Sequence, residues 1–278
     1  MIIFKQARQL SEYLQTQKNL GKKIGFAPTM GALHKGHMQL IEQAAANNDL
    51  TVCSIFINPT QFNNPEDFQK YPKTIEQDIE LLTGYDCDIL FLPTKDEVYP
   101  ANYVAPHYDL GYLENILEGQ YRPGHFQGVC QVVDLLLNIV QPQNLYLGQK
   151  DYQQCMVLSR LLEIRGSGEQ LHFVPTKRED DGLAMSSRNL RLNESQRVLA
   201  TAIYQVLTFL KANITKLPLT DLRLQGRQQL EEKGFTVDYV AISNANTLRE
   251  AHSTNEPLIG LVAAFLGPIR LIDNERLN

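Results

Sequence analysis

Apolar and polar residues alternate along the N-terminal part of the chain in blocks that predict strands and helices in turn. Short apolar runs at residues 24–27, 49–57 and 87–93 predict buried strands. Segments rich in helix-forming residues separate these runs, at 39–46 and at 74–82. Strands that alternate with helices in this way indicate an α/β fold with a parallel sheet, whose ligands bind at the carboxyl ends of the strands. The second helix has Thr74 as its expected N-cap, with Gln77 three residues later.

The same alternation continues after a long irregular stretch at residues 94–127, which is rich in Tyr, Gly and Pro. Apolar residues then recur at helical spacing over 129–140, and strands are expected at 144–147 and 171–175. A long loop in a compact domain is often functional, and this one carries Arg122 and His125. They are candidates for phosphate or carboxylate contact, with incidental surface charge as the alternative.

A charged, turn-like segment at residues 176–182 marks a change of pattern and a boundary between domains. We predict a first domain at 1–176 with the parallel sheet and a smaller α+β domain at 177–278. The elements expected in the smaller domain are helices over 195–211, with Asn193 as the cap, and 219–233, and strands over 235–242, 258–266 and 269–272.

Composition narrows the functional classes. The 278 residues are 43% hydrophobic and 21% charged, which is typical of a soluble globular protein. A net charge of −5 without a long basic run gives no support to a nucleic-acid partner. We expect neither a signal peptide nor a membrane helix, because the N-terminus lacks a basic segment and no long apolar run occurs. Four scattered cysteines in apolar segments predict free buried thiols and a cytoplasmic location.

The stretch from Pro28 to His37 is the strongest candidate for chemistry. It joins a predicted strand to a predicted helix and holds two glycines and two histidines. Such a turn directs backbone N–H groups and the positive end of the helix dipole at one point, which suits a phosphate. An imidazole can donate a hydrogen bond to a phosphoryl oxygen or a proton to a leaving group near neutral pH.

The spacing of this motif excludes two common phosphate-binding loops. His37-Met38 stands where a P-loop needs Lys-Ser/Thr, and the glycines do not fit a dinucleotide fingerprint. His34-Lys35-Gly36-His37 resembles the HxGH motif of the nucleotidyltransferase superfamily, whose members attack the α-phosphate of a nucleoside triphosphate. The alternative is an ordinary glycine turn with two surface histidines.

Two later segments carry groups that suit a triphosphate. Gly148-Gln149-Lys150-Asp151 is a second glycine turn between a strand and a helix, in which Lys150 would neutralise phosphate and Asp151 would cap the helix. Gln154 lies one turn after Lys150 and is expected on the same side. Further on, Met185-Ser186-Ser187-Arg188 places two hydroxyls beside a guanidinium.

Together these segments resemble the pantothenate synthetase (pantoate–β-alanine ligase) family along almost the whole chain. The residues that carry the resemblance are those of 28–37, 56–62, 122–129, 148–154 and 181–189, with Asp238-Tyr239 and 270–274 near the C-terminus. The resemblance implies a Rossmann-like domain that binds ATP and pantoate, and a C-terminal domain that acts as a lid. It also implies a reaction: ATP and pantoate would form pantoyl-adenylate, which β-alanine would convert to pantothenate and AMP. Mg²⁺ and a homodimer are implied as well.

The resemblance also assigns the site residue by residue. His37 would be the proton donor, with His34 and Lys150 as further catalytic groups, and Gln61 and Gln154 would bind pantoate, Gln61 also meeting β-alanine. The residues expected to hold ATP are Met30, Gly31, Ala32, Leu33, His34, Lys35, Gly36, His37, Gly148, Gln149, Lys150, Asp151, Lys177, Met185, Ser186, Ser187 and Arg188. Lys177 stands where the family commonly has valine. We expect Mg²⁺ on the ATP phosphates and water, and name no protein ligand for it.

Two rival functions remain open from the sequence. A nucleotidyltransferase would release a stable nucleotidyl product without ligation, which the Gln61 and Gln154 segments argue against. A catalytically idle nucleotide sensor belongs to a different class, and the presence of His34, His37 and Lys150 argues against it.

Overall fold

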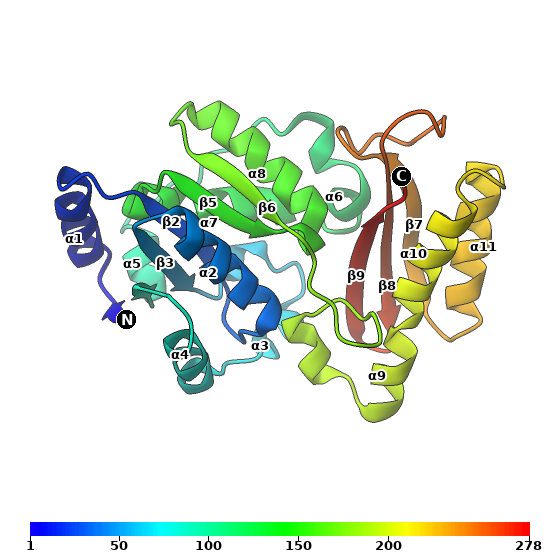
Figure 1. Cartoon of the computed structure of the whole chain (residues 1–278), viewed down its shortest axis with the longest axis horizontal. Helices are drawn as coiled ribbons and strands as arrows, with labels where there is room; N and C mark the ends of the chain where they lie inside the picture. Colours follow the sequence, from blue (N-terminus) through cyan, green and yellow to red (C-terminus); the bar gives the residue numbers. More distant parts are fainter. The chain divides into compact units, whose positions relative to one another are not determined.

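The computed structural model describes all 278 residues, and they form two compact units built on different sheets (Figure 1). The first unit comprises Met1–Gln149 and Gln153–Pro175. The second unit comprises Lys150–Tyr152 and Thr176–Asn278, so a short piece from the middle of the chain is grouped with the C-terminal part. None of the helices combines the length and the apolar character that a membrane span requires.

The first unit contains a six-stranded sheet in the order β1-β4-β3-β2-β5-β6, and every neighbouring pair is parallel. This sheet confirms the predicted α/β class. Its strands are β1 Ile2–Phe4, β2 Ile24–Thr29, β3 Leu50–Ile55, β4 Ile89–Phe91, β5 Asn144–Gly148 and β6 Gln170–Val174. The sequence did not indicate β1, because this edge strand has only three residues and two of them are exposed.

Helices pack on this sheet through apolar stripes. The bounds of the long helices are α1 Ala7–Asn19, α2 Lys35–Asn47, α4 Ile75–Thr83, α7 His125–Val140 and α8 Tyr152–Arg165. Helix α2 contacts β2, β3, β5 and β6, and it buries Met38, Ile41 and Ala44 against this sheet (Figure 1). The carboxyl end of β2 and the beginning of α2 are thereby held in place by a continuous core.

Short helices replace the long loops that the sequence predicted. They are η1 Pro59–Gln61, α3 Pro65–Gln69, α5 Lys95–Val98, η2 Gly111–Glu114, α6 Leu117–Tyr121 and η3 Gln149–Asp151. The first two begin with an Asn-Pro pair, in which the asparagine side chain accepts a backbone N–H of the helix. The prediction of an irregular stretch at 94–127 was therefore wrong in detail.

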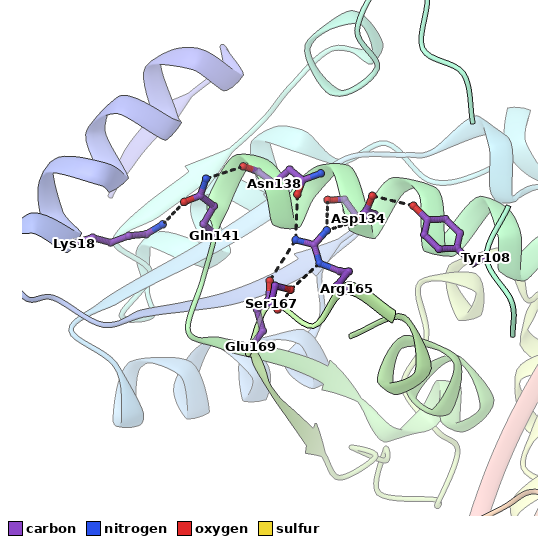
Figure 2. Close-up of polar contacts among 8 residues, drawn as sticks. All are labelled: Lys18, Tyr108, Asp134, Asn138, Gln141, Arg165, Ser167 and Glu169. Carbon is purple, nitrogen blue, oxygen red and sulfur yellow. Dashed lines mark hydrogen bonds and ion pairs between the residues drawn. The ribbon is translucent and has the colours of Figure 1, made fainter. Parts of the chain in front are cut away.

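A polar network ties the end of α8 to α7 (Figure 2). Arg165 forms an ion pair with Asp134, donates to the Asn138 side chain, and lies 3.5 Å from Glu169. The Tyr108 hydroxyl donates to the second oxygen of Asp134 at 2.9 Å. Because the side chains of Arg165 and Asp134 are only 14% and 21% exposed, this pair is screened less than a surface ion pair.

The second unit is a three-stranded antiparallel sheet in the order β7-β8-β9, with α10 and α11 side by side against it (Figure 1). This confirms the predicted small α+β region. Its elements are η4 Ser187–Arg191, α9 Glu194–Ala200, α10 Ala202–Asn213, α11 Leu219–Glu231, β7 Thr236–Asn244, β8 Leu258–Leu266 and β9 Ile269–Arg276. Asn193 caps α9 in a capping box with Gln196, as predicted. The expected single helix over 195–211 is divided at Thr201, whose hydroxyl bonds the Val198 carbonyl.

Candidate active site

The turn between β2 and α2 has an unusual backbone. The Thr29 hydroxyl donates to the Ser54 carbonyl of β3 at 2.7 Å and accepts from the Gly31 N–H at 3.3 Å. Gly31 and Ala32 then follow with φ of 80° and 49°. A side chain at position 31 would also be crowded, because a Cβ there would lie 3.0 Å from Ile55. Glycine is therefore favoured at position 31, because a side chain there would be strained by the backbone conformation and tight against Ile55.

Both motif histidines lie at the N-terminus of α2, which starts at Lys35 and not at the predicted residue 39. His34 is the N-cap, and its Nδ1 accepts the Gly36 N–H at 3.2 Å. His37 Nδ1 accepts the His34 N–H at 3.3 Å, so that the two residues form a capping box. A neutral imidazole whose Nδ1 accepts carries its proton on Nε2. The helix N-terminus thus carries two Nε2–H donors, on rings whose centroids are 4.0 Å apart.

Gln61 lies beside this turn. Its Nε2 is 3.2 Å from Sδ of Met30, while its Oε1 accepts from Asn58 Nδ2 at 3.2 Å. Asn58 is only 1% exposed, and its own oxygen accepts from the hydroxyls of Tyr99 and Thr60 at 2.7 and 3.1 Å. This network fixes the orientation of the Gln61 amide: Asn58 occupies the carbonyl oxygen, and the NH₂ group lies against Met30.

Arg122 and His125, predicted as ligand candidates, contact the Gln61 backbone in this structure. His125 begins α7, is 5% exposed, and lies with Nδ1 2.7 Å from the Gln61 carbonyl oxygen. Because a carbonyl can only accept, Nδ1 of His125 is the donor. Arg122 Nη2 lies 3.5 Å from the same oxygen, and Arg122 is paired with Glu118 at 3.6 Å. Gly128 permits this packing, since a Cβ there would lie 2.5 Å from the Thr60 carbonyl oxygen.

The first unit brings the predicted residues of several strands to one edge of its sheet. Strand β2 lies between β3 and β5, and all three are parallel, so their carboxyl ends share an edge. The predicted residues at or after these ends are Met30–His37, Gln61, Gly148, which is the last residue of β5, and Gln149. Gln154 lies on α8 and is half-buried.

Gln153, the residue before Gln154, is buried and connects α8 to residues 113–118. Its side chain donates to the carbonyls of Leu113 and Ile116 and accepts the Glu118 N–H. Glu118 in turn pairs with Arg122, which contacts the Gln61 carbonyl. Gln153 therefore supports the Gln61 turn through this chain of contacts.

The remaining predicted ATP residues belong to the second unit. Asn274 Nδ2 donates to the Lys150 carbonyl at 2.8 Å, and the Met185 N–H donates to the Lys177 carbonyl at 2.9 Å. Ser186 is the N-cap of η4, where its hydroxyl accepts the Arg188 N–H at 3.3 Å. The residues of this unit are Lys150, Asp151, Lys177, Met185, Ser186, Ser187 and Arg188.

A buried ion pair supports the segment that contains these serines. Arg178 contacts Asp273 at 2.6 Å and lies 4.3 Å from the centroid of the Tyr204 ring. Burial raises the pKa of Asp273, while the hydrogen bond and charge of Arg178, and the charge of Lys150, act in the opposite direction. The Lys150 ammonium therefore interacts electrostatically with this carboxylate.

Sequence reasoning missed four residues that shape the site: Asn58, Tyr99, Gln153 and Asp78. Asn58 gave a signal that sequence reasoning could have used, because it is a polar residue directly after a predicted buried strand. Asp78 accepts the backbone N–H groups of Ala32 and Leu33. No group of three or more His, Cys, Asp or Glu side chains is arranged to hold a metal ion.

Comparisons with known proteins identify the family of this chain. The family model for pantoate–β-alanine ligase matches residues 2–276. A pantothenate synthetase of Cytophaga hutchinsonii is 42% identical, over 99% of this chain and 98% of the relative. The structure of a pantothenate synthetase from Thermus thermophilus has a TM-score of 0.94 at 37% identity, covering 100% of this chain and 99% of the other.

A pantoate–β-alanine ligase of Francisella tularensis, solved with β,γ-ATP and β-alanine, has a TM-score of 0.85 at 37% identity. The match covers 100% of this chain and 98% of that one. With a family model that spans nearly all residues and relatives that match over their full length, this chain belongs to the pantoate–β-alanine ligase family.

Proposed function

We propose that this chain performs the reaction of its family with His34, His37 and Lys150 as its catalytic side chains. The reaction is the ATP-dependent condensation of pantoate with β-alanine. In the first step, a pantoate carboxylate oxygen attacks the α-phosphorus of ATP and pyrophosphate leaves, which gives pantoyl-adenylate. In the second step, the amine of β-alanine attacks the acyl carbon, loses a proton, and releases pantothenate and AMP.

The observation that carries this proposal is the capping box of α2. His34 and His37 each accept a backbone N–H at Nδ1, so each ring presents Nε2–H at the positive end of a helix. Negative charge develops on the phosphoryl oxygens and the departing pyrophosphate during adenylation, and fixed donors help most where charge develops. His37 is the group that we expect to donate to the leaving pyrophosphate.

We propose that Lys150 and Arg188 supply positive charge to the triphosphate, with the hydroxyls of Ser186 and Ser187 as neutral donors. Asn274 holds the backbone of Lys150 through its carbonyl, and the ammonium of Lys150 would balance the charge of the triphosphate. The remaining ATP contacts that we propose are Met30–Leu33, Lys35, Gly36, Gly148, Gln149, Asp151, Lys177 and Met185.

Gln61 is suited to pantoate and β-alanine because its orientation is fixed. Asn58 occupies its carbonyl oxygen, and its NH₂ group contacts the weak acceptor Sδ of Met30. A carboxylate or hydroxyl oxygen is a stronger acceptor and would replace this sulfur contact. Gln154 is proposed as a second pantoate contact. The Francisella tularensis ligase was solved with β-alanine, which supports a site for this substrate in the family.

We also propose a metal ion, a lid, an oligomeric state and a cellular compartment for this enzyme. Mg²⁺ would arrive with ATP, since it prefers phosphate oxygens and water to a site made only of protein groups. Residues 177–278 would act as a lid over the domain at 1–176, and the enzyme would be a homodimer. The four buried free thiols support a reducing compartment such as the cytoplasm.

The deciding experiment supplies ATP, Mg²⁺ and pantoate with and without β-alanine, and follows pyrophosphate, AMP and pantothenate. We expect free AMP and pantothenate only when β-alanine is present. His37→Ala and Lys150→Ala should each lower the rate of pyrophosphate release by roughly 10²–10³-fold. His107→Ala and Lys22→Ala, at exposed positions, are the matched controls and should leave the rate unchanged. A stable nucleotidyl product that β-alanine does not consume would indicate a nucleotidyltransferase instead.

A further inference from the structure

We propose that Asp78 of α4 is a positioning residue that sets the shape of the β2–α2 turn and thereby the placement of His34 and His37 during adenylate formation. This inference rests on the proposed function of these histidines. The Asp78 carboxylate bonds backbone N–H groups of the turn and acts on the two histidines only through the backbone.

The Asp78 carboxylate accepts two backbone N–H groups of the turn. Its Oδ2 accepts the Ala32 N–H at 3.0 Å, and its Oδ1 accepts the Leu33 N–H at 2.7 Å. The Thr74 hydroxyl donates to Oδ1 at 3.1 Å. The carboxylate is thus shared between two successive N–H groups that lie 46 and 45 residues away in the chain. Asp78 is 2% exposed, so water does not compete for these bonds.

The conformation of the turn explains why such an anchor is needed. Ala32 has a φ of 49°, a left-handed conformation that costs energy for a residue with a side chain. It persists only where surrounding contacts impose it. Asp78 bonds Ala32 itself and the residue after it, and Leu33 directly precedes the N-cap His34. The carboxylate therefore fixes the direction in which the chain enters α2.

The bonds of Asp78 also determine which N–H groups of the turn can donate to a phosphate. Because the N–H groups of Ala32 and Leu33 donate to Asp78, they are not the donors that meet a triphosphate in this conformation. Among the groups of this turn, the phosphate contacts then fall to the first turn of α2 and to the two Nε2–H groups. The Gln61 amide has a separate anchor, because Asn58 holds its carbonyl oxygen whereas the Asp78 carboxylate bonds Ala32, Leu33 and Thr74.

Asp78→Asn tests whether Asp78 affects the ATP contacts of the turn and leaves the Gln61 contact with pantoate intact. An amide has one acceptor oxygen, so it keeps one of the two backbone bonds and places an NH₂ group against the other N–H. We expect the rate of pyrophosphate release to fall by roughly 10²-fold, as expected when catalytic groups shift by about 1 Å, together with a raised KM for ATP. The KM for pantoate should stay unchanged.

Asp88→Asn is the matched control. Asp88 also accepts a backbone N–H, that of Thr51 at 2.8 Å, but Asp88 directly precedes β4 and Thr51 lies at the amino end of β3, whereas the turn follows the carboxyl end of β2. It should leave both KM values and the rate unchanged, even if thermal stability drops. A weaker variant, Thr74→Val, removes one bond to Asp78 and should raise the KM for ATP by a smaller factor. Thr74→Val decides the question if Asp78→Asn does not fold.

The outcomes separate this inference from the proposed function. If His37→Ala abolishes pyrophosphate release while Asp78→Asn, or Thr74→Val in its place, keeps wild-type ATP parameters, only the role of Asp78 is overturned. If Asp78→Asn raises the KM for ATP and pantoate equally, Asp78 has a general structural role and the inference also fails. If His37→Ala leaves the rate unchanged, the proposed site itself is wrong.

Discussion

His37 accepts the backbone N–H of His34 through Nδ1, at 3.3 Å, and this bond links the chemistry of the site to the folding of its helix. The two histidines cap α2, so a substitution by alanine would remove a helix cap as well as a potential phosphate donor. Variants that keep the cap and remove only the Nε2–H group separate the catalytic effect of His37→Ala from the loss of the cap.

His34→Asn and His37→Gln are such variants. Asn is a preferred N-cap, and Gln is a usual third residue of a capping box, so both variants keep the acceptor of their backbone bond. We expect the thermal stability to stay close to that of the wild type, and the rate of adenylate formation to fall by about 10²–10³-fold for His37→Gln. Pyrophosphate release in single-turnover assays and thermal unfolding measure the two effects. A loss of stability with full activity would mean that these histidines serve only as caps.

Gly128→Ala tests whether the packing of α7 sets the pantoate site. Alanine favours a helix over glycine by about 1 kcal/mol, but its Cβ would lie 2.5 Å from the Thr60 carbonyl oxygen and 2.9 Å from the Gln61 nitrogen. The turn that carries Gln61 must therefore move. We expect a higher KM for pantoate with little change in the KM for ATP. Gly84→Ala, with its nearest neighbour at 3.5 Å, is the control, and equal kinetics in the two variants would refute this role for Gly128.

The sequence predicted the parallel sheet, the small α+β region and the motif turn because each depends on local patterns. Strands β2 to β6 are apolar runs between turns, and the histidine motif lies between such a run and a helix. It did not predict how the motif is held. Thr74 is the N-cap residue of α4, as predicted, but its hydroxyl makes no cap bond and donates to Asp78 instead.

The reason is that the supporting bonds join residues far apart in the chain. Asp78 bonds residues 45 and 46 positions away, and Asn58 bonds the Gly128 carbonyl 70 positions away. No local period shows such pairs. The sequence nevertheless held a signal for Asp78, because its spacing puts it on the same helical face as Ile75, Ile79 and Leu82. A carboxylate on a buried helical face needs hydrogen-bond partners, and here the partners are the catalytic turn.

Arg165→Ala is expected to destabilise the first unit without changing the chemistry. It leaves Asp134, whose side chain is 21% exposed, without its ion pair, and it also removes the bonds to Asn138 and Glu169 (Figure 2). Since the pair is partly exposed, we expect a loss of about 2 kcal/mol in the free energy of unfolding. Urea denaturation measures it. Arg8→Ala, which breaks an exposed ion pair with Glu12, should cause no measurable change. Equal effects of the two substitutions would contradict the role of the network.

The four cysteines are free and buried, and we expect their thiols to be protected from reaction in the native protein. Burial raises the pKa of Cys87 and of Cys130 to about 12, and it raises the pKa of Cys53 well above its ordinary value. A thiolate is the reactive form, so at about pH 8 these three thiols should react slowly with a disulfide reagent in the native protein. All four should react quickly after unfolding in urea. Rapid labelling of the native protein would contradict the structure.

The same shifts set the direction of a pH effect on stability. An unfolded thiol ionises near pH 8.5, whereas the native Cys130 keeps its proton up to about pH 12. The unfolded state therefore binds fewer protons above about pH 9, so the free energy of unfolding should fall as the pH rises from there toward 12. Cys130→Ala removes one of these groups, and its urea midpoint should fall less steeply with pH than that of the wild type. A parallel decline in both proteins would show that Cys130 ionises alike in the two states.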